Sequence, residues 1–393
     1  MSYVNRMRGN PLTPIALDWP FLLANAGGSF IAGILADRFS PVVVVACGLM
    51  GSSLCLLSAS IPSDAAFGST WILTFQLLHG AFYATALPGN IAILANWFSA
   101  EGKDSGFIYG TFALAPGLGY ATAEFFWSNI LSAGYNWRWS IILPAIIAAA
   151  WALILPLLLP KPSETGLSGE DERDIIPFSQ AITFPHAMNC ALAFGFFKLV
   201  HFALFYQLPT ILTSRFDPAY NYMIFWSYLN LFMMGGIPYG VVSDLSGGRK
   251  ACVLATFMGL LCPLLFVPAN YMGKLTFVNM AHLAGAMGFL LGGPLIVLNS
   301  QVAIQLADNI RMKSNKKAVG TITGTIDGCS LLIAALGQLT IPILHKMGVT
   351  NGVGYKYVWY LLIVCTVLGT ALMSPLIYKE CYPETHTPLN KKA

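Results

Sequence analysis

The sequence predicts an all-α, polytopic membrane protein made of two similar helical bundles, and three observations lead to this class. The chain has 393 residues, of which 56% are hydrophobic and only 10% are charged, whereas a soluble domain has about 25% charged residues. Apolar runs of about 20 residues, the length that spans a bilayer, follow one another along the chain. A short motif also occurs twice, half a chain apart: Gly33–Arg38 and Gly240–Lys250 each hold a glycine, an aspartate four positions on and then basic residues.

The apolar runs predict eleven transmembrane helices, several with internal glycine and proline, as membrane helices allow. In chain order the predicted spans are 16–36, 41–61, 71–97, 106–132, 139–159, 189–212, 221–243, 250–270, 275–306, 318–345 and 355–378. The longest charged loop, 160–188, separates five of these spans from the other six.

This division predicts an N-terminal bundle over 1–159 whose first helix is missing, a cytoplasmic linker over 160–188, a C-terminal bundle of six helices over 189–380, and a cytoplasmic tail over 381–393. Lysine and arginine favour cytoplasmic loops, and most of them lie on one side when the loop after Arg38 is placed in the cytoplasm. Arg6 and Arg8 then lie on the opposite side. We therefore expect one further helix before residue 16, which would make the two bundles equal.

Composition argues against several other classes of function. The net charge of +4 is spread over the loops, so no basic face indicates nucleic-acid binding. The eight cysteines form no CxxC pair and mostly fall in apolar runs, which is typical of small buried side chains. No Ser-His-Asp order, metal-ligand spacing or phosphate-binding loop is found, so we expect neither an enzyme nor a cofactor or metal. The expected partners are a small-molecule substrate and the lipid bilayer.

The repeated motif resembles the loop motif G-x-x-x-D-R/K that follows the second helix in the major facilitator superfamily. Other segments resemble the sugar-phosphate exchanger family of solute carriers, a group of organophosphate:phosphate antiporters. These segments are Leu17–Leu23 at the second helix, Asn96–Phe98 in a loop, Glu164–Gly169 in the linker, Phe197–Val200 and Leu208–Pro209 in the seventh helix, and Tyr378–Glu380 at the end. The longest match is Ala318–Gly328 followed by Ala334–Gln338, which resembles the eleventh helix of that family.

The resemblance implies twelve helices and the exchange of a sugar phosphate for inorganic phosphate, commonly in the endoplasmic reticulum membrane. Three features differ from the family's pattern. Residues 1–15 are too few for the first helix, which carries a phosphate-binding element in the family. Trp226–Asn230 holds no acid where the eighth helix has W-Y-D, and Cys329–Ile333 replaces a glycine-rich run of the eleventh helix.

Lys198 is the first substrate-binding candidate because it lies well inside a predicted span, where a lysine costs roughly 3 kcal/mol on insertion scales. His201, three positions on, shares its helix face, so the two could bind a phosphate together. The alternative is a lysine whose amine reaches the membrane interface. Asp327 is expected either to pair with Lys198 when substrate is absent or to contact a neighbouring helix. Asp18 is a further candidate, or else an N-cap at the outer surface.

Tyr228 and His79 complete the substrate-binding candidates. His79 forms a stripe with Gln76 and Tyr83 along one face of its helix, which either lines a cavity or bonds a neighbouring helix. Glu124 is a second acid inside a span and is the candidate for proton coupling.

Asp37 with Arg38, and Asp244 with Arg249, are the gating candidates. Acid and base at a helix end can pair with the neighbouring helix and hold the cytoplasmic side closed, as rocking transporters require. The alternative is that the basic residues only set the topology.

Together these features predict a transporter that exchanges an organic phosphate for inorganic phosphate by alternating access, with its site between the bundles. Two alternatives stay open: a proton-coupled carrier of another small polar solute that uses Glu124, and a transport-impaired homologue from an incomplete gene model. Asn390–Ala393 resembles a dilysine retrieval signal shifted by one place, which favours the endoplasmic reticulum over another internal membrane or the plasma membrane.

Overall fold

The computed structural model describes residues 14–61, 65–98, 105–159, 176–184, 186–212, 215–295 and 318–382, and its regular structure in these ranges is entirely helical. The helices of the first half are α2 (Pro14–Arg38), α3 (Pro41–Ala59), α4 (Ala65–Tyr83), α5 (Ala86–Trp97), α6 (Ser105–Phe112), α7 (Leu114–Ser132) and α8 (Trp139–Leu158). The short α9 (Phe178–Ile182) follows.

The second half holds α10 (Ala187–Leu212), α11 (Pro218–Met234), α12 (Gly236–Leu245), α13 (Lys250–Tyr271), the 3₁₀ turn η2 (Met272–Lys274), α14 (Phe277–Gly293), α16 (Val319–Gln338), α17 (Thr340–Thr350), α18 (Lys356–Leu372) and α19 (Ser374–Cys381). Each of the predicted spans coincides with one helix or with two consecutive helices, and the part of 275–306 beyond residue 295 lies outside the described residues. The all-α membrane fold predicted from the sequence is therefore confirmed.

Seven helical segments of the described chain are long and apolar enough to cross a membrane, and the bent pair α18–α19 would be an eighth. The remaining predicted spans are made of shorter pieces: α14 has 17 residues, and α6–α7 and α11–α12 are broken. Residues 1–13 and most of the predicted linker and tail lie outside the described residues, so the expected missing helix and the part boundaries stay predictions.

Proline explains where the broken spans break. Pro88, Pro116, Pro238 and Pro342 each occupy the third position of the helix that follows the break, in α5, α7, α12 and α17. A proline has no N–H to give to the carbonyl four residues earlier, and its ring crowds that carbonyl, so the helix is interrupted about one turn before the ring. The α18–α19 pair follows the same logic with Pro375 in its second half, and it bends by 48°.

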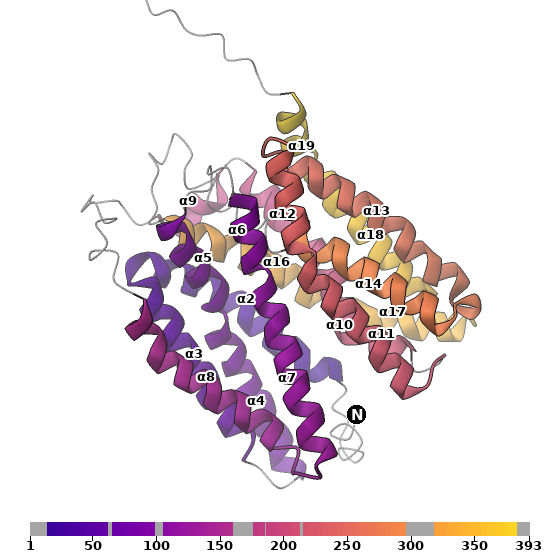
Figure 1. The fold of residues 1–393 in the computed structure, drawn as a ribbon, viewed down its shortest axis with the longest axis horizontal. Coiled ribbons are helices and arrows are strands. Elements are labelled where there is room, and N and C mark those ends of the chain that lie inside the picture. The colour runs from indigo at the N-terminus through magenta and orange to yellow at the C-terminus, as the bar shows by residue number, and fades with distance from the viewer. Residues whose placement is uncertain are drawn as a thin grey trace, which may run out of the picture.

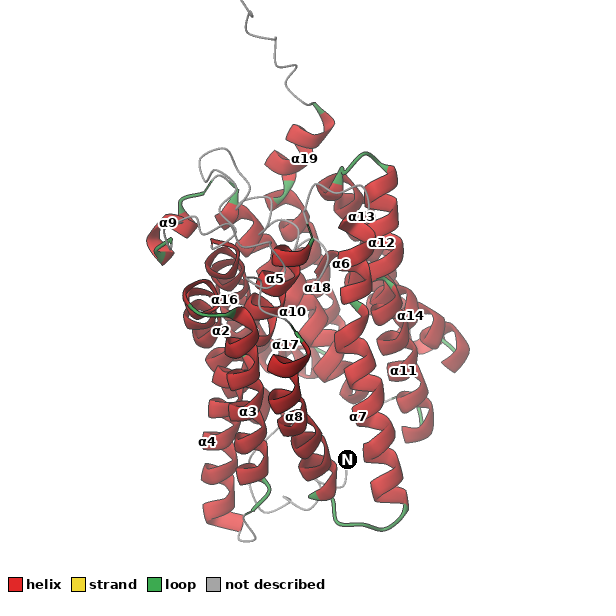
Figure 2. Ribbon diagram, turned by 60° about the vertical axis from the view of Figure 1, so that its left-hand side comes forward, coloured by secondary structure: helices red, strands yellow, loops and turns green. Residues whose placement is uncertain are grey.

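The helices form two groups, the N bundle (α2 to α8) and the C bundle (α10 to α19). Figure 1 shows them as an indigo-to-magenta group and a pink-to-yellow group, and Figure 2 shows most helices running in the same general direction. Within the C bundle, α10 packs against α16 and α18, and its Phe194 and Phe197 are fully buried in the same apolar core as Trp359 of α18. This large core gives α10 and α16 a fixed support for the polar side chains that they carry.

The two bundles meet closely where α2 crosses α16. A Cβ on Gly33 would lie 2.5 Å from the carbonyl oxygen of Gly320, and a Cβ on Gly324 would overlap the carbonyl oxygen of Ser29. Small residues allow such backbone contact between membrane helices. The glycines of the two helices are therefore required by the distance between them.

A second crossing, between α6 and α12, repeats this arrangement in the other half of the molecule. A Cβ on Gly110 would lie 2.6 Å from the carbonyl oxygen of Gly236, and a Cβ on Gly240 would overlap that of Gly106. Gly33 and Gly240 are the glycines of the repeated sequence motif. Both crossings lie at the end of the molecule that carries Arg38, Arg249 and Lys250, which we call the basic end.

Candidate functional site

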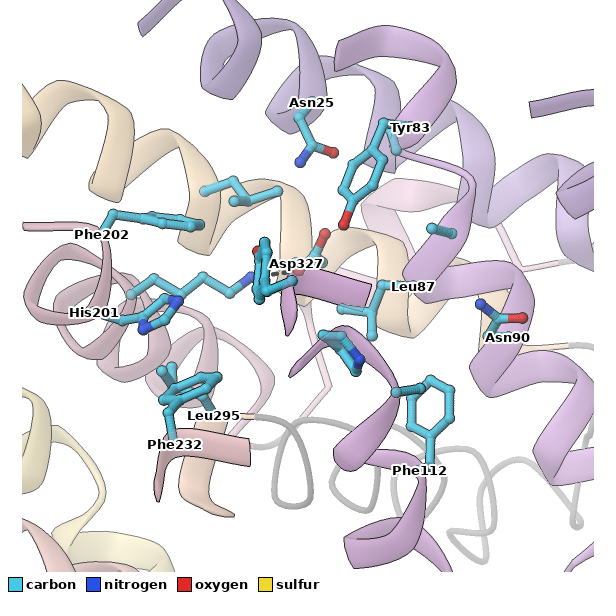
Figure 3. A pocket seen from close by; sticks show the side chains of 17 residues that line it. Asn25, Tyr83, Leu87, Asn90, Phe112, His201, Phe202, Phe232, Leu295 and Asp327 are labelled. Carbon is cyan, nitrogen blue, oxygen red and sulfur yellow. Dashed lines mark hydrogen bonds and ion pairs between the residues drawn. The ribbon is translucent and has the colours of Figure 1, made fainter. Parts of the chain in front are cut away.

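A cavity of about 320 Å³ lies between the two bundles, walled by α2, α4, α5, α6 and α7 on one side and by α10, α11 and α16 on the other. Figure 3 shows it from close by. Most of its described lining is apolar or aromatic. The polar side chains are those of Asn25, Tyr83, Asn90, Tyr120, Lys198, His201 and Asp327.

Lys198 and Asp327 form an ion pair at the wall of this cavity, between α10 and α16. The lysine amine also donates to Ser330 Oγ at 2.7 Å, and Ser29 Oγ donates to the second carboxylate oxygen of Asp327 at 2.9 Å. Lys198 is 8% exposed and Asp327 is 4% exposed. Charges this deeply buried are tolerated when each is paired and its remaining hydrogen-bonding atoms are occupied, and the two serines meet that requirement.

His201 lies one helical turn from Lys198 and is held in place by aromatic neighbours. Its Nδ1 is 2.8 Å from the hydroxyl of Tyr228, and its ring stacks on Phe232 with the centroids 4.3 Å apart. Tyr228 is fully buried and lies behind the cavity wall, so it contacts His201 and does not line the cavity. In the described part of the chain, Nε2 of His201 has no hydrogen bond, so it is the ring nitrogen left for a ligand.

The N bundle adds only neutral polar groups to the described lining. Asn25 of α2 and Asn90 of α5 are two of them, and the Tyr83 hydroxyl of α4 points towards Asp327 in Figure 3. The charged pair therefore belongs to the C bundle, and the N bundle faces it with hydroxyl and amide groups. In the described residues, no group of three or more His, Cys, Asp or Glu side chains could hold a metal ion.

The gating candidates Asp37 and Asp244 lie at the two glycine crossings of the basic end. The carboxylate of Asp37 accepts hydrogen bonds from the backbone N–H groups of Gly320, at 2.8 Å, and Thr321, at 2.6 Å. Both residues lie in the first turn of α16, whose N-terminus carries partial positive charge. The acid thus contacts a helix N-terminus of the opposite bundle.

Asp244 makes the equivalent contacts with α6. Its two carboxylate oxygens accept from the backbone N–H groups of Gly106, at 3.0 Å, and Phe107, at 3.1 Å. In both copies of the motif the glycine allows the crossing, and the aspartate one turn later lies on the same helix face and reaches the facing helix. Arg38 and Arg249, the basic gating candidates, are exposed.

Of the three remaining candidates, His79 does not line the cavity, and the side chains of the other two lie outside the described residues. His79 lies between α4 and α3, where its Nδ1 is 2.7 Å from Ser52 Oγ and its ring packs against Phe21. His79 therefore bonds a neighbouring helix, which is one of the two alternatives given for the stripe of Gln76, His79 and Tyr83. Of these three side chains, only Tyr83 lines the cavity. Asp18 belongs to α2 and Glu124 to α7, but their side chains lie outside what the structure describes.

The sequence reasoning missed Ser29, Ser330, Asn25 and Asn90. Ser330 could have been found, because it lies three positions after Asp327 and so shares its helix face. Ser29 and the two asparagines carry no comparable signal, since a polar residue in an apolar run often bonds its own helix. Ser53, which donates to the carbonyl of Leu49 at 2.7 Å, is such a case.

A bundle of membrane-spanning helices in two halves, with a cavity between them that is mostly apolar but holds a buried ion pair, is typical of a membrane transporter. The profile of the Major Facilitator Superfamily matches residues 15–338, and the chain belongs to this family.

Among curated relatives, the chain is 25% identical over 408 residues to "Sugar phosphate exchanger 3" of Xenopus laevis, covering 93% of this chain and 79% of that protein. It is 28% identical over 403 residues to "Glucose-6-phosphate exchanger SLC37A2" of Danio rerio, with coverage of 93% and 79%. It is 27% identical over 403 residues to "Putative glycerol-3-phosphate transporter 2" of Arabidopsis thaliana, with coverage of 93% and 77%.

Solved structures agree with the fold. The proton:xylose symporter XylE bound to 6-bromo-6-deoxy-D-glucose superposes with a TM-score of 0.73 at 13% identity, covering 93% of this chain and 88% of that one. The transporter FucP in the outward conformation gives a TM-score of 0.66 at 14% identity, with coverage of 91% and 88%. At these identities the likeness concerns the fold.

Proposed function

We propose that this transporter exchanges an organic phosphate, such as a sugar phosphate, for inorganic phosphate by alternating access. The observation that carries the proposal is the buried Lys198 at the cavity wall, with His201 one turn away. The names of the relatives support it, because a sugar phosphate, glucose 6-phosphate and glycerol 3-phosphate share one chemical group, the phosphate monoester.

Phosphate can compete with Asp327 for the amine of Lys198. A phosphate monoester carries a charge of about −1.5 to −2 near pH 7 and offers three strong acceptor oxygens, whereas a carboxylate has one charge and two oxygens. The ion pair then holds Lys198 in position while no substrate is bound. Nε2 of His201 would bind a further phosphate oxygen or a substrate hydroxyl.

The contacts at the basic end support alternating access. Asp37 and Asp244 each join one bundle to a helix N-terminus of the other, so these contacts close that end of the cavity. The basic end is expected to be cytoplasmic, because lysine and arginine favour that side. Rocking of the bundles would break both contacts together and open the cavity towards the cytoplasm.

Counterflow of labelled phosphate in proteoliposomes tests the proposal. Vesicles loaded with unlabelled phosphate are expected to accumulate labelled phosphate, and empty vesicles are not, because exchange requires substrate on both sides. Glucose 6-phosphate or glycerol 3-phosphate should compete, and glucose should not. Equal uptake by loaded and empty vesicles would exclude exchange, and competition by glucose alone would exclude the phosphate assignment.

A proton-coupled carrier of a neutral solute is the second candidate, and one observation favours it. Lys198 and Asp327 are the charged side chains of the described cavity lining, and they neutralise each other. A neutral cavity suits an uncharged polar solute as well as an anion. The same vesicles distinguish the two candidates: an imposed pH gradient would drive net uptake of labelled sugar into empty vesicles in a symporter, and would not in an exchanger.

We propose the endoplasmic reticulum membrane as the location, because Asn390–Ala393 resembles a dilysine retrieval signal shifted by one place. A fluorescent tag in the N-terminal segment should report a reticular pattern for the full chain. Replacement of Lys391 and Lys392 by alanine should move the protein to later membranes. An unchanged distribution would show that these lysines carry no retrieval signal.

A further inference from the structure

One carboxylate, that of Asp327, joins the two bundles beside the cavity. One of its oxygens holds Lys198 of the C bundle, and the other accepts the hydrogen bond from Ser29 of the N bundle. Asp327 itself belongs to α16, so its contact with Ser29 is the one that crosses between the bundles. A change in the ion pair of Lys198 with Asp327 therefore affects the hydrogen bond that joins the two bundles.

The position of Ser29 is fixed by the backbone around it. Its carbonyl oxygen lies where a Cβ on Gly324 would have to be, one turn before Asp327 on the same helix. Ser29 is fully buried, and its hydroxyl is 2.9 Å from the carboxylate. This hydroxyl can follow Asp327 only if α2 and α16 move together.

Tyr83 supplies a second N-bundle hydroxyl at the same carboxylate. It lines the cavity from α4, and its hydroxyl points towards Asp327 in Figure 3. In the part of the chain that the structure describes, no hydrogen bond joins the two groups, and one oxygen of Asp327 is engaged by Lys198. Tyr83 is thus placed to donate to that oxygen once Lys198 leaves it.

We propose that Ser29 and Tyr83 are positioning residues that take over Asp327 when an anion captures Lys198, so that substrate binding draws the N bundle onto α16. This inference rests on the proposed function, because it requires an anion at Lys198. In the empty protein one carboxylate oxygen pairs with Lys198 of the C bundle, and the other accepts from Ser29 of the N bundle. In the loaded protein both of its oxygens are held by N-bundle hydroxyls.

The takeover is needed because the carboxylate is deeply buried. Asp327 is 4% exposed, and without Lys198 it would be an unpaired charge with one hydrogen bond. Hydrogen bonds to an ionised group are about twice as strong as neutral ones, so a second hydroxyl offsets part of that loss. The hydroxyl comes from the opposite bundle, so the loaded state is stabilised only when the bundles are close. Binding and closure are thereby linked, as exchange without net leak requires.

The test compares the binding of labelled phosphate with its maximal exchange rate, using the full chain in proteoliposomes. The double variant Ser29→Ala, Tyr83→Phe is expected to bind phosphate with a half-saturating concentration within about threefold of the wild type. Its maximal exchange rate should fall by about tenfold or more, because the two charge-assisted hydrogen bonds that hold Asp327 in the loaded state, the existing one from Ser29 and the new one from Tyr83, are both lost. A residue that only stabilises the fold would not separate binding from rate in this way.

Ser53→Ala with Tyr360→Phe is the matched control. Ser53 is also fully buried, but it bonds the carbonyl of its own helix, and Tyr360 bonds Asn270 away from the cavity. This control should exchange at close to the wild-type rate. Exchange at the wild-type rate by the Ser29 and Tyr83 variant would overturn the inference, and so would a parallel loss of binding and rate. A wild-type protein that binds no phosphate would instead overturn the proposed function.

Discussion

At the scale of single residues, Lys198 shows that a charged side chain inside a membrane span requires a partner within the protein. A lysine in the middle of a 26-residue helix cannot reach water at either end of its span without crossing several helical turns, so it needs a partner inside the protein. The structure supplies Asp327 and Ser330. Under the proposed function, the same need for a partner would allow the lysine to bind an anion that enters the cavity.

Removal of the Lys198 charge should abolish phosphate exchange. In Lys198→Ala the cavity keeps its shape but loses the cation, so labelled phosphate should no longer bind. Lys198→Arg should keep part of the activity, because the charge remains while the planar guanidinium changes the geometry. Counterflow in proteoliposomes measures both variants, and wild-type exchange by Lys198→Ala would exclude Lys198 from the binding site.

Asp327→Asn should change thermal stability and its response to phosphate. This change tests whether the carboxylate competes with phosphate for Lys198. The amine is left buried without a counter-charge, and breaking a buried ion pair costs about 3–5 kcal/mol. The thermal midpoint of unfolding without phosphate should therefore fall. Added phosphate should raise the midpoint by more than it does in the wild type, because the ligand then supplies the missing charge. An equal phosphate response in both proteins would contradict the competition.

The charged members of the site could be predicted from the sequence, whereas its neutral members could not. Lys198 and Asp327 stand out because an ionised side chain in an apolar span needs a partner. Ser29 and Asn25 do not stand out, because a serine or asparagine can bond a carbonyl of its own helix at little cost. Thr325, which donates to the carbonyl of Thr321, shows the same ambiguity within α16 itself.

At the scale of elements, the contact between α2 and α16 depends on glycine. Gly33→Ala should push the helices apart, because the new methyl group would lie 2.5 Å from the backbone oxygen of Gly320. Gly27→Ala on the same helix is the matched control, since nothing lies within 4 Å of its Cβ position. We expect Gly33→Ala to lose most of its exchange rate and Gly27→Ala to keep it.

Counterflow measured on equal amounts of folded protein checks this prediction, with monodispersity in detergent as the measure of folding. Equal rates in the two variants would mean that α2 and α16 do not need to approach this closely for exchange.

The sequence located the spans well but not their breaks. Apolar runs of bilayer length are a strong signal, and each one coincides with a helix or a helix pair. Prolines inside the runs are ambiguous, because Pro144 and Pro263 lie in continuous helices whereas Pro88 and Pro116 follow breaks. Neighbouring helices decide which prolines are accommodated, and a single sequence does not contain that information.

At the scale of the whole molecule, the repeated motif predicts two equivalent contacts that hold the bundles together at the basic end. Asp37→Asn together with Asp244→Asn removes the charges that face the N-termini of α16 and α6. Each such contact is worth about 1 kcal/mol or less when exposed and more when buried. The double variant should therefore open the basic end more often than the wild type.

A cysteine in place of the cavity residue Leu87 measures this opening. Its reaction with a membrane-impermeant thiol reagent added at the basic end should be about fivefold faster, or more, in the double variant, given two contacts of that size. Glu380→Gln is the matched control. Glu380 also accepts from a helix N-terminus, at Ala251 and Cys252 of α13, but within the C bundle. An increase of the same size in the control would show that loss of any carboxylate loosens the protein.

The proline breaks have a consequence for how this cavity can be mapped by mutagenesis. Ala84 and Phe112 both line the cavity, and they lie four residues before Pro88 and Pro116. Their main-chain oxygens therefore miss the amide that a regular helix would offer, and they remain acceptors that no exchange of the Ala84 or Phe112 side chain can remove. An alanine scan of the wall would pass over them. Pro88→Ala or Pro116→Ala would restore the missing amide and occupy the carbonyl. A loss of substrate affinity in such a variant would indicate that a substrate hydroxyl donates to this main-chain oxygen.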